Sequence, residues 1–111
     1  MVIVTNKDQG ARIKLKQYEL FAVEISYNPT TGTHISGPSF QKIQNAVVIK
    51  ETYYPDNPEL VGSPGKKVYL MMTTVPVSSS LYWFFTSPGH IGHISEFNFK
   101  LSVVPYKRKD D

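Results

Sequence analysis

The chain has 111 residues, of which 41% are hydrophobic and 13% aromatic, and a formal net charge of +3 at pH 7. This length and apolar content are typical of one folded domain, expected over residues 1–111, and they exclude a disordered tail. Cysteine is absent, which excludes disulfides, thiolate metal ligands and a cysteine nucleophile.

The basic residues form no wide stripe along the sequence. Part of their excess lies in Lys107-Arg108-Lys109, directly before Asp110 and Asp111, so we expect a solvated tail and no nucleic-acid partner. Val2-Ile3-Val4 is too short for the apolar region of a signal peptide, and no apolar run approaches the ~20 residues of a membrane span. The sequence thus predicts no membrane association and favours the cytoplasm, with a lysosomal or secreted location as the alternative if a leader was removed.

The first half of the chain has strand composition. Prolines and glycines divide it into short segments rich in Val, Ile, Tyr, Phe and Thr, which leaves little room for helices. Arg12–Lys16 alternates basic and apolar residues, which predicts a half-buried edge strand, and Leu20–Tyr27 places most of its apolar residues on one face. Three more strands are predicted at Thr33–Ser36, Phe40–Ile43 and Ala46–Tyr54, with a break at Gly37-Pro38.

The second half continues this pattern. Lys67–Val75 alternates, with Val68, Leu70, Met72 and Thr74 on one face. Ser78-Ser79-Ser80 predicts a turn before Leu81–Phe85, whose Trp83 is expected in the core rather than on a stacking surface. Phe97–Val103 alternates cleanly. Seven or eight short strands predict an all-β, immunoglobulin-like β-sandwich, with a small barrel as the alternative.

Three loops between these strands stand out, because alternate loops of a sandwich gather at one end. The first loop contains Asn28, Pro29, Thr30, Thr31 and Gly32; the second, Leu60 to Gly65, contains Gly62, Ser63, Pro64 and Gly65; the third, Thr86 to His93, contains Ser87, Pro88, Gly89 and His90. In the first loop, proline fixes its own φ, glycine permits a positive φ and the threonines are stiff at χ1. Taken alone, this is a β-turn that carries hydroxyls.

Together the three loops resemble those of the chagasin-type inhibitors of papain-like cysteine peptidases, a family that includes the amoebiasins. The Asn-Pro-Thr-Thr-Gly match is complete. Gly62-Ser63-Pro64-Gly65 keeps the outer glycines of the family's Gly-x-Gly-Gly, and Ser87-Pro88-Gly89 keeps only the proline of its Arg-Pro-Trp or Arg-Pro-Phe. The resemblance extends over residues 20–103, most of the chain.

The resemblance implies a reversible, monomeric inhibitor of papain-like cysteine peptidases that is not an enzyme and needs no cofactor. In such inhibitors the first loop enters the catalytic cleft without being cleaved, and Thr30 would lie nearest the peptidase's cysteine and histidine. Gly62 and Gly65 would let backbone run along the substrate groove. Pro88 would set the path of the third loop, where His90, Ile91 or His93 would replace the family's aromatic residue.

Other functions compete with this interpretation. The main alternative is an immunoglobulin-like adhesion or interaction module without inhibitory activity. His90 and His93 with His34 are weak candidates for a metal site, since no cysteine is present. A hydrolase that uses Ser78 to Ser80 or Ser87 would lack a recognisable nucleophile elbow and a paired acid and base. We therefore expect neither a metal nor catalysis.

Overall fold

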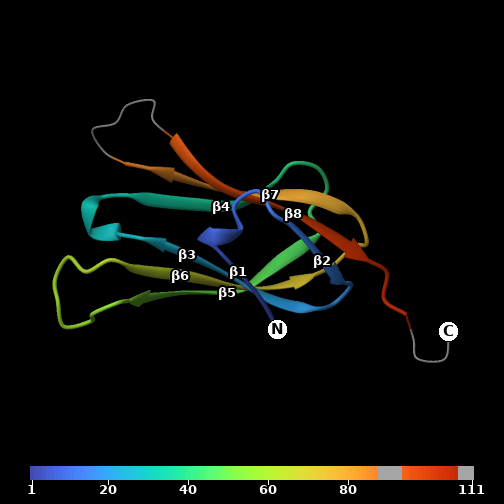
Figure 1. Ribbon diagram of the computed structural model, residues 1–111, viewed down its shortest axis with the longest axis horizontal. Coiled ribbons are helices and arrows are strands. Elements are labelled where there is room, and N and C mark those ends of the chain that lie inside the picture. The colour runs from blue at the N-terminus through green and yellow to red at the C-terminus, as the bar shows by residue number, and fades with distance from the viewer. Residues whose placement is uncertain (88–93, 108–111) are drawn as a thin grey trace.

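Two four-stranded sheets form the molecule, in a computed structural model that describes residues 1–87 and 94–107. The elements in these ranges are β1 (Val2–Thr5), η1 (Asn6–Asp8), β2 (Arg12–Lys16), β3 (Leu20–Tyr27), η2 (Pro29–Thr31), β4 (His34–Phe40), β5 (Ala46–Pro55), β6 (Gly65–Thr73), β7 (Ser78–Thr86) and β8 (Ile94–Val104). The first sheet has the order β1-β3-β6-β5 and the second the order β2-β8-β7-β4 (Figure 1). The predicted all-β sandwich is confirmed, and no helix in the described ranges is long and apolar enough to cross a membrane.

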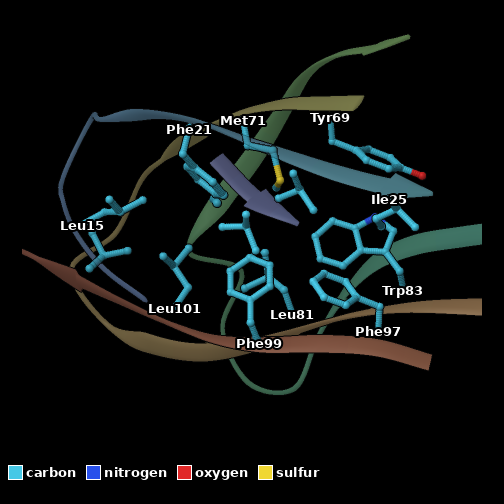
Figure 2. Packing of buried hydrophobic residues seen from close by; sticks show 14 residues of the cluster. Leu15, Phe21, Ile25, Tyr69, Met71, Leu81, Trp83, Phe97, Phe99 and Leu101 are labelled. Atoms are coloured by element: carbon cyan, nitrogen blue, oxygen red, sulfur yellow. The ribbon is translucent and has the colours of Figure 1, made fainter. Parts of the chain in front are cut away.

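The core lies between the inner faces of the two sheets (Figure 2). Its buried side chains are Val4, Leu15, Phe21, Val23, Ile25, Ala46, Tyr69, Met71, Leu81, Trp83, Phe97, Phe99, Leu101 and Val103. Trp83 is fully buried, with its ring centroid 5.9 Å from that of Phe99 and 5.5 Å from that of Tyr69 on the opposite sheet. Contacts of this kind remove aromatic surface from water, which is the main stabilising term. The predicted core position of Trp83 is confirmed.

β6 turns its less hydrophobic face inward. Tyr69, Met71 and Thr73 are buried, whereas Val68 and its apolar neighbours on the predicted face are half-buried on the outside of the sheet. Thr73 is compatible with the interior because its hydroxyl donates to the backbone carbonyl of Lys16 and accepts from the N–H of Glu19. Both faces of this central strand carry apolar residues, so alternation alone does not identify the buried one.

β4 is one strand where the sequence predicts two. It runs through Gly37-Pro38 as the outer strand of its sheet, with a register shift between Ser36 and Ser39. Proline is tolerated because an edge strand leaves one side of its backbone without a ladder partner. Gly37 has φ 141°, and a Cβ there would lie 2.7 Å from the backbone oxygen of Tyr82. The predicted strand at Phe40–Ile43 is therefore wrong beyond Phe40.

The structure differs from the prediction at two further short segments, one polar and one apolar. Ser78-Ser79-Ser80 begins β7 instead of forming a turn, and the Ser78 hydroxyl donates to that of Ser102 on β8 over 2.9 Å. β1 was not predicted, because four residues are too few to show a period. It pairs in parallel with β3, and Val4 is fully buried.

Candidate functional site

The strand register brings the three loops to one end of the sandwich, which we call the loop pole. In the first sheet, Tyr27 at the end of β3 pairs with Gly65 at the start of β6. In the second sheet, His34 at the start of β4 pairs with Thr86 at the end of β7. The β3–β4 and β5–β6 connections therefore leave from this end, as Figure 1 shows on the left, and β7 ends and β8 begins at the same end. The first loop is the one that crosses between the two sheets.

The first loop is a single 3-10 turn, η2, between two caps. Asn28 is extended (φ −118°, ψ 101°), as expected before a proline, and Gly32 is left-handed at φ 82°. The N–H of Gly32 donates to the carbonyl of Pro29 over 3.1 Å and closes the turn. Thr30 and Thr31 are exposed at the tip, and none of η2 is buried. The predicted turn therefore projects its hydroxyl-bearing residues outward.

Asn28 is the residue that holds this turn in shape. Its side-chain oxygen accepts hydrogen bonds from the N–H of Thr30, at 3.0 Å, and from the Thr30 hydroxyl. Its backbone carbonyl accepts from the Thr31 hydroxyl at 2.8 Å. Its side-chain amide then donates to the carbonyl of Gly62 at 3.1 Å, which ties the first loop to the second. Asn28 thus acts as a positioning residue for two loops.

A second set of hydrogen bonds ties the first loop to the third. The hydroxyls of Thr31 and Thr33 lie 3.0 Å apart, and those of Thr33 and Ser87 lie 3.1 Å apart. With the Asn28 contacts, these form a chain of hydrogen bonds from Gly62 to Ser87 across the loop pole. Thr33 was not predicted as a site residue, since its partner is 54 positions away and no sequence spacing indicates that contact.

The second loop divides into exposed and supporting residues. Gly62, at φ 86°, and Pro64 are exposed, whereas Ser63 and Gly65 are buried. The Ser63 hydroxyl accepts from the N–H of Asn57 at 3.1 Å and donates to the carbonyl of Pro64 at 3.0 Å. Ser63 and Gly65 therefore shape the loop from within, and Gly62 and Pro64 form its outer surface.

The tip of the second loop also carries two apolar side chains that were not singled out from the sequence. Leu60 is 61% exposed and Val61 is 99% exposed. The tip is a closed turn, since the N–H of Ser63 donates to the carbonyl of Leu60 at 3.3 Å. The sequence did carry a signal for this pair: apolar residues that lie between turn residues cannot reach the core, so they are expected at the surface.

Below the loops, two tyrosines pack beside Gly65. The rings of Tyr27 and Tyr53 meet edge to face with centroids 5.7 Å apart. A Cβ on Gly65 would lie 2.5 Å from the Tyr53 hydroxyl oxygen and 2.5 Å from the Tyr54 backbone oxygen, so only glycine fits. Burial, with lesser effects of Tyr27 and Asp56, raises the pKa of Tyr53. Gly65 thus lets the β5 backbone and the Tyr53 ring approach β6 closely at the base of the loop pole.

Of the predicted site residues in the third loop, the structure describes Ser87. Ser87 is half-buried and bonded inward to Thr33, whereas Pro88, Gly89, His90, Ile91 and His93 lie outside the described residues. Within residues 1–87 and 94–107, no group of three or more His, Asp or Glu side chains is placed to hold a metal ion.

Comparison with known proteins gives matches in structure only. No protein-family model and no curated protein matches the sequence. The cysteine protease inhibitor EhICP2 from Entamoeba histolytica superposes with a TM-score of 0.76 at 15% identity, over 92% of this chain and 94% of that one. Amebosin gives 0.71 at 20% identity, over 92% and 96% of the two chains.

A third solved structure, PbICP-C in complex with falcipain-2, gives a TM-score of 0.59 at 10% identity, over 96% of this chain and 100% of that one. The three matches span nearly the whole length of each partner, so they compare complete folds rather than fragments. The likeness inferred from the loops is confirmed at the level of the fold: this chain has the fold seen in these three structures, which include a cysteine protease inhibitor.

Proposed function

We propose that the protein is a reversible inhibitor of papain-like cysteine peptidases that blocks the catalytic cleft with its loop pole. The observation that carries this proposal is the chain of hydrogen bonds from Gly62 through Asn28 to Ser87, which joins an exposed first loop to both flanking loops. The fold adds support, because EhICP2 is a cysteine protease inhibitor and PbICP-C was solved in complex with falcipain-2.

The loop pole has the physical properties that such a contact needs. No residue from Asn28 to Thr33 carries a charge, so little desolvation opposes entry into a cleft. The turn is held by its own hydrogen bonds before any partner binds, which lowers the ordering entropy of association. Protease–inhibitor pairs of ordinary interface size often bind tightly for this reason, with little movement of the backbone.

The residues of the three loops have different proposed roles. Thr30 faces the peptidase's cysteine and histidine from the tip of the first loop. The backbone at Gly62 and Pro64 follows the substrate groove, and Leu60 and Val61 present apolar surface beside it. Pro88, Gly89 and His90 complete the contact on the other side. Asn28, Ser63 and Gly65 act indirectly, by holding the loops that make these contacts.

Resistance to cleavage follows from the shape of the first loop. Peptidases attack a backbone bound in near-attack geometry, with the carbonyl carbon open to the nucleophile. The Thr30–Thr31 peptide bond lies instead within a 3-10 turn that the Gly32 N–H closes onto Pro29. Opening that turn would also break the Asn28 bonds, so the bound loop keeps a form that is poorly attacked.

Titration of active papain with the purified protein tests this function. We expect loss of activity at a one-to-one ratio, recovery on dilution and an intact inhibitor chain by mass spectrometry. Trypsin serves as the control, since it has a different nucleophile and cleft. If papain keeps its full activity at micromolar protein, the proposal is wrong and the protein is an interaction module with the same fold.

A further inference from the structure

The fold brings the basic residues of β2 beside those of β8 and of the chain that follows it. Along β2, inward Ile13 and Leu15 alternate with outward Arg12, Lys14 and Lys16, all three exposed. Side chains on one face of a strand are about 6.6 Å apart, so these cations form a short row. β8 pairs with β2 in parallel and sets Lys100 opposite Arg12 on the same face.

At the end of this row lies a cleft, which we call the lysine cleft. It has a volume of about 360 Å³ and is lined by Lys14, Lys16, Val104, Pro105, Tyr106 and Lys107. Three of the six lining residues are lysines, and none of the six has a carboxylate. A lysine ammonium offers three donors and no acceptor, so the cleft presents donors and positive charge.

The wall of the lysine cleft is held in place by contacts behind it. The Tyr106 N–H donates to the side-chain oxygen of Gln17 at 3.2 Å, and the Gln17 N–H donates to the carbonyl of Val104 at 2.8 Å. The ring of Tyr18 packs against that of Tyr106 with centroids 6.1 Å apart. These contacts fix the chain that follows β8 beside the end of β2, so the cleft exists before any ligand binds.

Tyr18 itself is unusual in this setting. It is a non-glycine residue at φ 66°, in the left-handed region, where a side chain is disfavoured. The residue is 59% exposed, so burial does not explain the choice of tyrosine. Its contact with Tyr106 does, because that contact supports the wall of the cleft.

We propose that the lysine cleft binds an anion with several clustered phosphate groups, such as a soluble polyphosphate or a phosphorylated lipid headgroup. Lys14, Lys16 and Lys107 would bind the phosphate oxygens, and Val104, Pro105 and Tyr106 would contact the uncharged part. β8 separates this cleft from the loop pole by ten residue steps, roughly 33 Å. A ligand here and a peptidase at the loop pole can therefore bind together, and this proposal does not depend on the proposed function.

Inorganic triphosphate is the soluble probe, followed by NMR of backbone amides in the full chain at low salt. We expect shifts confined to residues 14–18 and 104–107. The pair Lys14→Gln with Lys16→Gln should raise Kd about thirtyfold, since each lysine at such a site contributes roughly fivefold to binding. The matched control, Lys42→Gln with Lys50→Gln, removes the same charge from exposed positions elsewhere and should leave Kd unchanged.

Vesicles of phosphatidylcholine with and without a phosphoinositide distinguish the two sources of phosphate. Binding of triphosphate alone supports a soluble ligand, and binding to the phosphoinositide vesicles supports a headgroup, again provided that the cleft variant weakens it. Equal weakening by the control pair, shifts spread over all lysines, or no binding to either probe would each overturn the lysine cleft. Papain titration should give the same result with the cleft variant and with the unchanged protein.

Discussion

The side-chain amide of Asn28 donates a hydrogen bond to the backbone carbonyl of Gly62, 34 positions further along the chain and 3.1 Å away. Both residues are at the surface, so this bond does little for the core. What it does is set the distance between the first and second loops. A partner that needs both loops in one arrangement gains from this bond before it binds, because the ordering entropy is already lost.

Replacing Asn28 by alanine should therefore weaken inhibition far more than stability. The change removes two bonds to Thr30 and the bond to Gly62, all between exposed groups that water can serve instead, so their loss loosens the loops more than it destabilises the core. We expect the inhibition constant for papain to rise at least about tenfold while the thermal midpoint changes little. Asn28→Ser is the matched variant: it stays uncharged, keeps a capping oxygen for the Thr30 N–H and loses the donor to Gly62, so it should give an intermediate effect. Equal inhibition by all three proteins would contradict the positioning role.

The bond between Thr33 and Ser87 can be isolated by a double-mutant cycle. Thr33→Val and Ser87→Ala each remove one of the two hydroxyls that lie 3.1 Å apart. Measured as inhibition of papain, the two changes should be less than additive, with a coupling energy of about 0.5–1 kcal/mol. Strictly additive effects would mean that the first and third loops act independently.

A bulky charge at the tip of the first loop tests the central contact. Thr30 is exposed, so Thr30→Arg should leave the thermal midpoint nearly unchanged. Inhibition of papain should fall by about a hundredfold or more, because the charge would be desolvated in the cleft. Thr52→Arg, at a half-buried position on β5, introduces the same charge away from the loops and should have no effect on inhibition. Persistent inhibition by Thr30→Arg would show that another loop makes the main contact.

Val61 offers a direct measure of the apolar surface on the second loop. At 99% exposure its side chain contributes nothing to the core, so Val61→Ala should not alter the free energy of unfolding. If Val61 is buried against the peptidase, the loss of two methyl groups should weaken binding by roughly 1–1.5 kcal/mol, about tenfold in the inhibition constant. Ile43→Val, at a residue that is 60% exposed and lies outside the three loops, is the control. An unchanged inhibition constant for Val61→Ala would remove this residue from the contact.

Gly65 should behave in the opposite way, with stability as the main readout. A Cβ at this position meets the Tyr54 backbone oxygen at 2.5 Å, and backbone cannot rotate away as a side chain can. We expect Gly65→Ala to lower the free energy of unfolding by about 1–3 kcal/mol in urea denaturation. Gly10→Ala is the contrasting variant: Gly10 has φ 72° and no atom within 4 Å of the added Cβ, whereas Gly65 has no positive φ, so its cost comes from overlap alone. A Gly65→Ala protein as stable as the original would disprove the close packing.

Much of the fold follows from local pattern. Alternation in Leu20–Tyr27 and Phe97–Val103 correctly identified buried faces, because a strand with one apolar face has one way to bury it. Alternation correctly placed Val68, Leu70 and Met72 of β6 on one face, but it could not show which face is buried, because both are apolar. It also could not show that β4 continues through its proline, which is tolerated at a sheet edge. It could not find β1, which is a strand only because β3 supplies its partner.

The sequence by itself determined the turn at Asn28–Gly32 and the absence of charge on it, since proline, glycine and the Asn28 side chain act over a few bonds. Only the tertiary structure decided what that turn touches. Thr33 meets Ser87, and Asn28 meets Gly62, through the register of two sheets. The same register gathers Lys14, Lys16 and Lys107 at one cleft. Register depends on contacts between distant segments, which no short stretch of sequence contains.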